Sequence, residues 1–542
     1  MRLKRYLSVL LLICFFVAVL PQNTFGTAPA AKIPSAFWKL APLYQKAVDD
    51  NNSNDIIDYG NKIIELFTGM EETQQVLEIV TPRLDKVARA YEELGKFDSA
   101  VEYYKKYIPK AEKLGWKDGV TYASSKINSL GFDIELYAKT QDSEKNLYFG
   151  SKHEPKAGVY FGSNYDSDPR IGSYKWNDIK KYFPKKNSAY LIYLHWKEDI
   201  KSFDRYFKDA KENNIAVQLA WNIDDVEIDS VLRNIASYES YIKTTADYLA
   251  RLKAPVFLRF AGEMNIKDNC KDYNSFIQAF RYVSGIMKDK APNVAMVWSP
   301  NDISAKDRTY GQYYPGDEYV DWVGISTYTY RYFQGKKDWG TQQDSIDSVF
   351  MTGDYANPLA KIKPIIDIYG TKKPIMLSET GIGHYSKLAG ENMSDWATMQ
   401  LRRLYVYGPM IYPQLKGIYY FNANNDYIAR YDDYSLYGSI KLNALYNELV
   451  SSGNFLSDIN GSPSFRYEKI TDYSVQGLKL ELSVYTIVPK VLNPTVQYKL
   501  DGKVCGVKTQ IPYTLELDLS ALPKGEHQFA VVLHDDPALV RA

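Results

Sequence analysis

The chain has 542 residues, with 66 Lys and Arg against 65 Asp and Glu, and a formal net charge of +1. This length exceeds what one ordinary hydrophobic core supports, so two to four domains are expected. The balanced charge gives no electrostatic basis for binding nucleic acid or an anionic surface, and we expect no nucleic-acid partner.

Residues 1–28 have the pattern of a secretory signal peptide. Basic residues within the first five positions precede an apolar run, Leu7–Leu20, and small residues follow it. The run is short for a membrane span, so we expect cleavage near Gly26 or Ala28; an uncleaved anchor is the alternative. The mature protein is therefore predicted to be secreted or extracellular, with association to the cell surface left open.

A helical domain is predicted over residues 35–140. Apolar and small residues recur there at helical spacing, and a second, weaker copy of the pattern covers Leu40–Phe67. The domain either offers a surface to a protein partner or serves as a spacer, and the sequence leaves both interpretations open. The polar stretch Ala138–Pro155 is interpreted as a linker. The following residues match the spacing of a tetratricopeptide-like hairpin: Ala88, Tyr91, Gly95, Phe97, Ala100 and Tyr104.

From residue 156 to residue 450, apolar strand-like runs alternate with amphipathic helical patterns. Eight β/α units in this length predict a (β/α)8 TIM barrel. A doubly wound sheet is the alternative, but no glycine-rich phosphate turn follows the first run. The eight runs are Gly158–Ser163, Ala189–Leu194, Ala216–Trp221, Val256–Phe260, Val294–Trp298, Trp322–Ser326, Pro374–Leu377 and Gly417–Phe421.

Residues 464–542 change to short runs that alternate apolar and polar side chains. Examples are Leu478–Val484, Val496–Leu500 and Gln528–Leu533, and Asp501-Gly502 is a hairpin turn signal. This pattern predicts a C-terminal β-sandwich of immunoglobulin-like type.

The carboxyl ends of the strands form the active site of a (β/α)8 barrel, so the predicted strands select a candidate set of residues. The set has two carboxylates but no Cys nucleophile. The five His of the chain show no metal-ligand spacing, and we expect no metal and no cofactor. The candidate catalytic residues are Glu263 and Glu379, and the candidate substrate-binding residues are His195, Trp221, Arg259, Asn265, Trp298, Tyr328 and Phe421.

Glu263 and Glu379 end the fourth and seventh predicted strands, 116 residues apart (379 − 263). In a closed eight-stranded barrel these ends face each other, which favours a carboxylate separation of about 5–5.5 Å. At that separation, one carboxyl group protonates the leaving oxygen of a glycoside and the other attacks the sugar carbon, with retention of configuration. Apolar neighbours favour Glu263 as the proton donor. Arg259 and Tyr328 could hold Glu379 ionised, although Arg259 could equally be a structural ion-pair partner and Tyr328 a rim group.

Four sets of strings stand in order between about Lys156 and Val450: Arg259–Asn265 (RFAGEMN), Val297–Asn301 (VWSPN), Tyr314–Asp317 (YPGD) with Val320–Gly324 (VDWVG), and Ser378–Gly381 (SETG). In these strings the region resembles glycoside hydrolase family 26, whose best-known members are β-mannanases. The resemblance implies that Glu263 is the acid/base, that Glu379 is the nucleophile and that Tyr328 touches the nucleophile.

The residues around the expected sugar site depart from that family. Gly262 stands where the mannanases usually have a His, no aromatic follows Asn265 until Tyr273, and strand eight ends in Phe421 rather than Trp. We therefore expect a secreted, monomeric, retaining endo-β-glycanase acting on a β-1,4-linked polysaccharide. Mannan is the first choice of substrate, and mixed-linkage β-glucan and xylan are alternatives. A non-catalytic glycan-binding or scaffold protein, with a protein partner on the helical domain, is the competing hypothesis.

Overall fold

The computed structural model describes residues 33–130, 133–140, 147–305, 307–332, 353, 356–425, 432–459, 461, 463, 465–470, 479–488 and 491–534. The predicted signal peptide lies outside these residues. No helix within them is long and apolar enough to span a bilayer. The chain divides into two compact units, residues 1–87 and 88–542, which are described separately.

The first unit is helical. It contains α1 (Phe37–Asp49), α2 (Ser53–Leu66) and the first part of α3 (Gln74–Glu93). The guanidinium of Arg83 lies 5.1 Å from the ring centre of Tyr44, which ties α3 to α1. Gly60 lets α2 approach α3, because a Cβ at this position would lie 2.5 Å from a methyl group of Val87. The predicted helical pair over Leu40–Phe67 is confirmed.

The second unit begins with the end of α3, followed by α4 (Phe97–Lys113) and α5 (Lys117–Leu130). Gly95 separates α3 from α4 with φ +70°, a left-handed conformation that glycine adopts without strain. Ala100 and Tyr104 are fully buried, and the Tyr104 hydroxyl donates to Glu92 at 2.5 Å. The helical hairpin is thus present, and its tetratricopeptide character stays a prediction.

The prediction that the helical domain extends to residue 140 is wrong at its C-terminal end. Residues Asp133–Thr140 form strand β1, because polar and apolar side chains alternate from Asp133 to Leu136 with the period of a strand.

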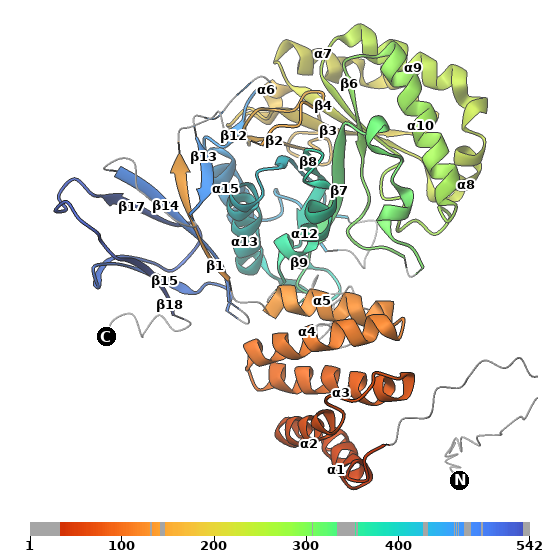
Figure 1. The fold of residues 1–542 in the computed structure, drawn as a ribbon. Coiled ribbons are helices and arrows are strands. Elements are labelled where there is room, and N and C mark those ends of the chain that lie inside the picture. The colour runs from red at the N-terminus through yellow and green to blue at the C-terminus, as the bar shows by residue number, and fades with distance from the viewer. Residues whose placement is uncertain are drawn as a thin grey trace, which may run out of the picture. The chain divides into compact units, whose positions relative to one another are not determined.

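The predicted barrel is present, with all eight strands near their expected positions (Figure 1). Neighbouring strands are parallel, in the order β12-β2-β11-β8-β7-β6-β5-β4-β3. The two-residue strand β12 (Phe455–Leu456) extends this sheet beyond β2 and was not predicted, because two residues carry no periodicity. The eight barrel strands are β2 (Val159–Ser163), β3 (Ala189–His195), β4 (Ala216–Asn222), β5 (Val256–Phe260), β6 (Val294–Trp298), β7 (Trp322–Thr329), β8 (Ile375–Ile382) and β11 (Leu415–Tyr420).

The ring closes between β2 and β3. The amide of Ser188 donates to the Phe161 carbonyl at 3.1 Å, and the Phe161 amide donates to Ser188 Oγ at 2.8 Å. A Cβ at Gly162 would lie 1.8 Å from the carbonyl oxygen of Ala189, so only glycine permits this approach.

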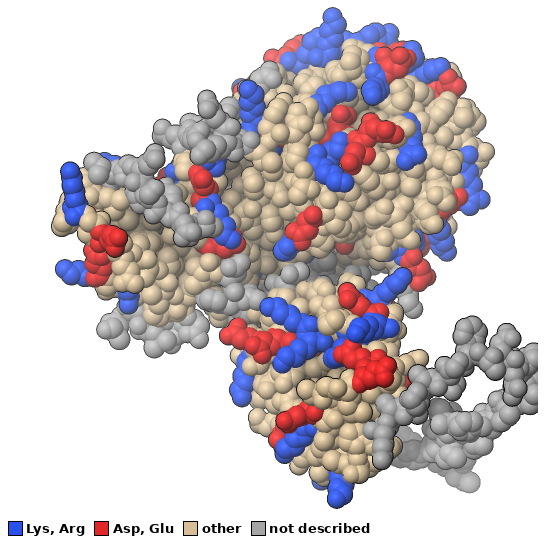
Figure 2. Space-filling view, viewed as in Figure 1, with Lys and Arg blue, Asp and Glu red and all other residues tan. Residues whose placement is uncertain are grey.

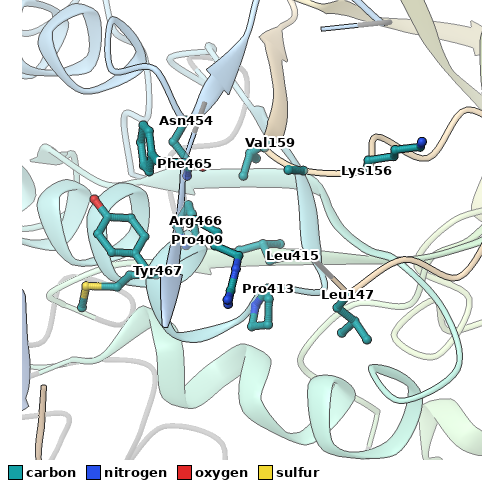
Figure 3. A pocket seen from close by; sticks show the side chains of 13 residues that line it. Leu147, Lys156, Val159, Pro409, Pro413, Leu415, Asn454, Phe465, Arg466 and Tyr467 are labelled. Carbon is teal, nitrogen blue, oxygen red and sulfur yellow. The ribbon is translucent and has the colours of Figure 1, made fainter. Parts of the chain in front are cut away.

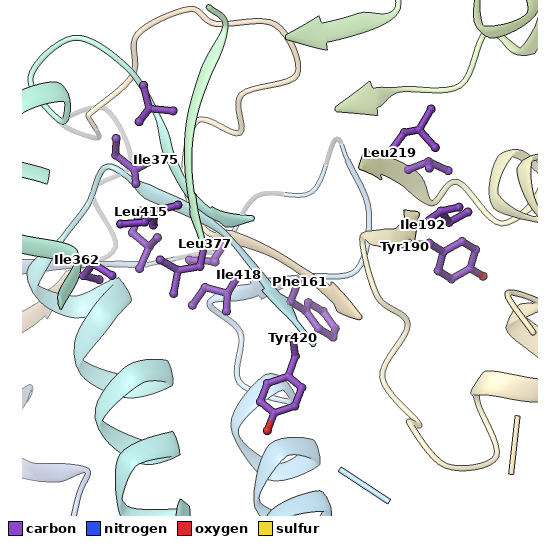
Figure 4. Packing of buried hydrophobic residues seen from close by; sticks show 14 of the residues in the cluster. Phe161, Tyr190, Ile192, Leu219, Ile362, Ile375, Leu377, Leu415, Ile418 and Tyr420 are labelled. Carbon is purple, nitrogen blue, oxygen red and sulfur yellow. The ribbon is translucent and has the colours of Figure 1, made fainter. Parts of the chain in front are cut away.

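Two apolar layers surround the strands, because successive side chains point to opposite faces. One layer fills the barrel and includes Leu191, Ala220, Val297 and Met376. The other lies between the strands and the helices, and Figure 4 shows Leu377 and Ile418 there beside Ile362 of α12. The helices of the barrel region are α6 (Trp176–Ile179), α7 (Asp204–Glu212), α8 (Asp225–Arg233), α9 (Glu239–Leu252), α10 (Tyr273–Lys290), α12 (Pro358–Tyr369), α13 (Ser394–Arg402), α14 (Gly408–Ile411) and α15 (Ile440–Val450), with a π-helical turn over Arg403–Tyr407. A small hairpin, β9 (Tyr385–Ser386) with β10 (Glu391–Asn392), follows β8.

The C-terminal region contains two antiparallel sheets. One has the order β13-β1-β14-β17 and the other β16-β15-β18. The turn at Asp501-Gly502 is confirmed, since Leu500 pairs with Lys503 across it. The immunoglobulin-like type stays a prediction. The strands are β13 (Arg466–Lys469), β14 (Lys479–Ile487), β15 (Thr495–Leu500), β16 (Lys503–Lys508), β17 (Tyr513–Asp518) and β18 (Phe529–His534).

Strand β1 belongs to the first of these sheets, although it precedes the barrel in the sequence and the other strands of that sheet follow it. Asp133 to Ala138 pair with Ile487 to Leu482 of β14, and Tyr137 to Thr140 pair with β13. The barrel is therefore inserted between β1 and β13 of one sheet.

This insertion makes a stability prediction. Ala138 faces a partner on both sides, Leu482 and Glu468, and proline there removes a ladder hydrogen bond. We expect Ala138→Pro to destabilise the C-terminal sheet by about 1–3 kcal/mol, because the group opposite the lost N–H is left unsatisfied; the measurements are urea unfolding and limited proteolysis after β13. Ala138→Gly is the matched control, because it keeps the amide N–H. Equal unfolding midpoints for the two variants would contradict the insertion.

The predicted linker is partly wrong. Residues 147–155 pack against the starts of the barrel strands, where Glu154 is buried and accepts from Lys416 Nζ at 2.7 Å. Trp322 Nε1 donates to the Lys152 carbonyl at 2.7 Å. These polar groups form hydrogen bonds with one another in the interior, and polar composition alone does not reveal this.

On the face in Figure 2, basic and acidic side chains are interspersed.

Candidate active site

The two glutamates lie at the carboxyl ends of β5 and β8, and one arginine contacts both. Arg259 Nη1 donates to Glu379 Oε2 at 2.6 Å, and its Nη2 lies 3.7 Å from Glu263 Oε1. A single guanidinium therefore brings the two carboxylates into one site. Their predicted separation of about 5–5.5 Å stays a prediction.

A β-bulge in β8 aims Glu379 at the mouth of the barrel. Ile325 of β7 pairs with Leu377, but the next residue, Ser326, pairs with Glu379. Strand β11 shows the same extra residue in β8. Ser378 faces the interior, where its Oγ lies 2.6 Å from Ser299 Oγ. Strict alternation would then turn Glu379 toward the helices, and the bulge prevents this.

Phenol groups lie against the carboxylate of Glu379, a buried residue. Tyr328 donates its hydroxyl to Glu379 Oε1. Burial and the Glu379 charge raise the pKa of Tyr328 well above its ordinary value, and the same causes raise the pKa of Tyr193. Both phenols therefore remain protonated beside this carboxylate, and Tyr328 is the one that donates to it.

Arg259 is held by hydrogen bonds along its whole guanidinium. Nε donates to Ser299 Oγ at 3.1 Å, and Nη2 donates to Ser326 Oγ at 2.6 Å. Burial alone would lower the pKa of Arg259, but the charges of Glu379 and Glu263 outweigh it and the net pKa is raised. Arg259 is thus a fixed cation that serves both carboxylates.

Glu263 sits on a strained turn after β5. Its φ is +62° and that of Ala261 is +46°, a region that residues with a side chain rarely adopt. The Glu263 amide donates to the Ser299 carbonyl at 2.9 Å, and Asn301 Nδ2 donates to Glu263 Oε1 at 2.9 Å. Strained backbone of this kind is typical of functional sites, where neighbouring contacts maintain it.

The family model Glycosyl hydrolase family 26 matches residues 175–383. The matched region spans β3 to β8 and contains both glutamates together with Arg259 and Tyr328. The barrel region belongs to glycosyl hydrolase family 26.

Relatives of this family 26 region are distant. Endoglucanase H of Acetivibrio thermocellus is 25% identical over 323 residues, covering 57% of this chain and 32% of the relative. Beta-1,3-xylanase TXYA of a Vibrio species is 31% identical over 106 residues, covering 19% of this chain and 23% of the relative. The match thus spans about a third or less of each relative's length. A family 26 β-mannanase structure from Bacteroides ovatus is 16% identical, with 58% of this chain and 92% of that chain covered and a TM-score of 0.39.

Gly262 follows directly from the placement of Arg259 in this family 26 site. A Cβ at residue 262 would lie 2.5 Å from Arg259 Nε and 2.8 Å from its Cζ. No side chain fits at residue 262 while Arg259 keeps its position. The position of Arg259 therefore explains why residue 262 is a glycine here and not the usual His.

Two predicted sugar contacts are wrong. Trp221 and Trp298 are fully buried in the layer between strands and helices of the family 26 barrel. Trp221 Nε1 donates to the Tyr241 hydroxyl at 3.3 Å, and the Trp298 ring lies 5.0 Å from that of Tyr314. Alternation explains the error: Ala220 and Val297 face the interior, so the residue after each faces outward.

Asn265 also differs from its predicted role, whereas the role of His195 stays a prediction. Asn265 is fully buried, and its amide is used within the protein by Asn301, Ile303 and Ser304. The His195 side chain is 67% exposed, with Nδ1 lying 3.6 Å from Asp224 Oδ1. None of the contacts in the described ranges joins His195 to either glutamate.

Phe421 lies beside Tyr328, the residue that donates to Glu379. Its ring meets Tyr328 edge-on at 5.8 Å and Tyr193 at 6.4 Å, and the Tyr328 ring lies 5.1 Å from that of Tyr434. Neither Tyr193 nor Tyr434 is among the predicted site residues. Tyr193 precedes His195 by two residues and so shares its face of β3, a signal that alternation offers. Tyr434 lies in a loop and gives no such signal.

A cavity of about 140 Å³ lies elsewhere in the family 26 barrel region. Its lining includes the starts of β2 and β11 and residues 465–467 of the C-terminal region (Figure 3). It is thus at the opposite strand ends from Glu263 and Glu379.

Among the residues that the structure describes, no group of three or more His, Cys, Asp or Glu could hold a metal ion.

Proposed function

We propose that the protein is a retaining endo-β-glycanase in which Glu379 is the nucleophile and Glu263 the acid/base. The observation that supports this is the pair of carboxylates joined by Arg259 at the carboxyl ends of β5 and β8. A glycan-binding protein without catalysis would have no need for this arrangement.

The reaction proceeds in two displacements. A Glu379 oxygen attacks the anomeric carbon while Glu263 gives its proton to the departing glycosidic oxygen, and a glycosyl ester forms. Glu263 then takes a proton from water, the resulting oxygen nucleophile attacks the anomeric carbon, and the bond to Glu379 breaks. Each carboxyl group ends in its starting state, and two inversions give net retention.

The surroundings of the two carboxylates support this division of roles. Donors hold both oxygens of Glu379, Tyr328 at Oε1 and Arg259 at Oε2, and these two contacts fix the orientation of the proposed nucleophile. The Glu263 side chain is more open, at 27% exposure against 10% for Glu379. An acid/base needs this access, because it meets first the glycosidic oxygen and then water.

The substrate is proposed to be a β-linked polysaccharide. The sequence strings of the barrel favour mannan, while the names of the relatives, an endoglucanase and a beta-1,3-xylanase, support the glucan and xylan alternatives. An exported enzyme would meet such polymers, and the predicted signal peptide in residues 1–28 agrees with this.

The stereochemistry of the first product tests the mechanism. The purified chain is incubated with mannan, mixed-linkage β-glucan, β-1,4-xylan and β-1,3-xylan, and the substrate that is cleaved is followed by proton NMR. We expect the β anomer to appear first and the α anomer only later, through mutarotation. Initial release of the α anomer would show inversion, and binding without cleavage of any polymer would favour the non-catalytic alternative.

A further inference from the structure

Asn301 presents a donor to the acid/base in one orientation only. Its Oδ1 accepts from the Ile303 amide at 2.9 Å, and its Nδ2 donates to Glu263 Oε1 at 2.9 Å. The reversed amide would set two donors against each other at Ile303 and two acceptors at Glu263, so the hydrogen bonds exclude it.

Asn265 holds Asn301 in place. Its Oδ1 accepts from the Asn301 amide at 2.8 Å, and its Nδ2 donates to the Asn301 carbonyl at 2.8 Å. Both backbone groups of Asn301 are thus fixed by one side chain, which is itself fully buried. This explains why Asn265 is unavailable to a substrate.

Both nearby donors face the same oxygen of Glu263. Asn301 Nδ2 bonds to Oε1, and Arg259 Nη2 lies 3.7 Å from Oε1. Within the described part of the chain, no hydrogen bond reaches Oε2. The two oxygens of this carboxyl group are therefore not equivalent.

We propose that Asn301 is a positioning residue that reserves Glu263 Oε1 as an acceptor, so that Oε2 carries the catalytic proton. This inference rests on the proposed function. A carboxyl oxygen that accepts from a fixed amide donor is a poor place for a proton, because the proton would oppose the donor N–H. Oε2 then gives the proton to the glycosidic oxygen and takes one from water in the second displacement. Asn265 acts one step further away, by fixing Asn301.

Leaving-group dependence separates this role from a structural one. A polysaccharide needs the proton from Glu263, whereas a dinitrophenyl glycoside of the same sugar departs without it. We expect Asn301→Ala to lower kcat/KM on the polysaccharide about 10²-fold, the effect of a misplaced catalytic group, and to leave kcat/KM on the dinitrophenyl glycoside little changed. Equal losses on both substrates would overturn the proposal.

Asn301→Asp is the second variant, because it keeps the oxygen that accepts from Ile303 and replaces the donor by a second oxygen. If Asn301 only supported its loop, Asn301→Asp would retain polysaccharide activity; we expect it to lose at least as much as Asn301→Ala. Asn234→Ala, an exposed Asn→Ala change, is the matched control for substitution alone. Thermal unfolding of each variant checks the fold.

Glu263→Gln distinguishes the failure of this inference from failure of the proposed function. If Glu263→Gln loses polysaccharide activity while both Asn301 variants keep it, the positioning role is wrong and the acid/base assignment stands. If Glu263→Gln is fully active, the proposed function itself fails.

Discussion

Glu379→Ala is expected to lose hydrolysis of polysaccharide and of dinitrophenyl glycoside alike, by about 10⁴- to 10⁶-fold in kcat, as for other lost catalytic nucleophiles. A better leaving group does not help, because the missing step is the attack on the anomeric carbon. The measurement is kcat on both substrates, with enzyme concentration high enough to follow slow turnover.

Part of any loss in Glu379→Ala could come from its effect on Arg259. The guanidinium is buried and donates to Glu379 Oε2 at 2.6 Å. Removing one partner of a buried ion pair costs about 3–5 kcal/mol. Glu263, with its Oε1 3.7 Å from Arg259 Nη2, remains as a counter-charge. We therefore expect reduced stability without loss of fold, measured by urea unfolding.

Ser326→Ala is the matched control for this effect, because it removes another Arg259 acceptor and leaves the nucleophile in place. Its kcat should fall far less than that of Glu379→Ala.

Chemical rescue of Glu379→Ala gives a further test: azide should enter the space left by the carboxylate and attack the activated β-glycoside directly. One displacement then yields the α-glycosyl azide. A Glu379→Ala enzyme with normal turnover would remove the nucleophile assignment.

Much of the barrel could be predicted from the sequence, because each of its strands is a short apolar run bounded by turns. The same runs located Glu263, Glu379, Arg259 and Tyr328 at strand ends. The errors at Trp221 and Trp298 were avoidable, since the alternation of side chains along a strand already turns both away from the interior.

Other features depend on tertiary contacts that no local pattern carries. The bulge that aims Glu379 appears only when the register of β8 is compared with β7 and β11. Residues 147–155 are polar like a linker, yet the buried Glu154 among them pairs with Lys416, which lies 262 residues further along the chain. The pairing of β1 with β14 is equally long-range. Gly262 departs from the family pattern, and only the position of Arg259 shows why a side chain is excluded there.

Glu263→Ala is expected to differ from Glu379→Ala in a way that identifies each role. On polysaccharide, loss of the general acid should lower kcat/KM by about 10²- to 10⁴-fold. On dinitrophenyl glycoside, the first displacement should continue, because Glu379 is intact and the leaving group needs no proton. The second displacement slows without a base, so a burst of dinitrophenol followed by slow turnover is expected. Glu227→Ala, on the exposed surface of α8, is the matched Glu→Ala control.

Azide should also restore turnover of Glu263→Ala. The anion needs no base and should attack the glycosyl ester on Glu379, so that two displacements give the β-glycosyl azide. The two variants should therefore yield azides of opposite configuration from one substrate, α from Glu379→Ala and β from Glu263→Ala. This contrast assigns the roles from chemistry alone. If Glu263→Ala gave the α product, or if its losses on the two substrates were equal, Glu263 would not be the acid/base.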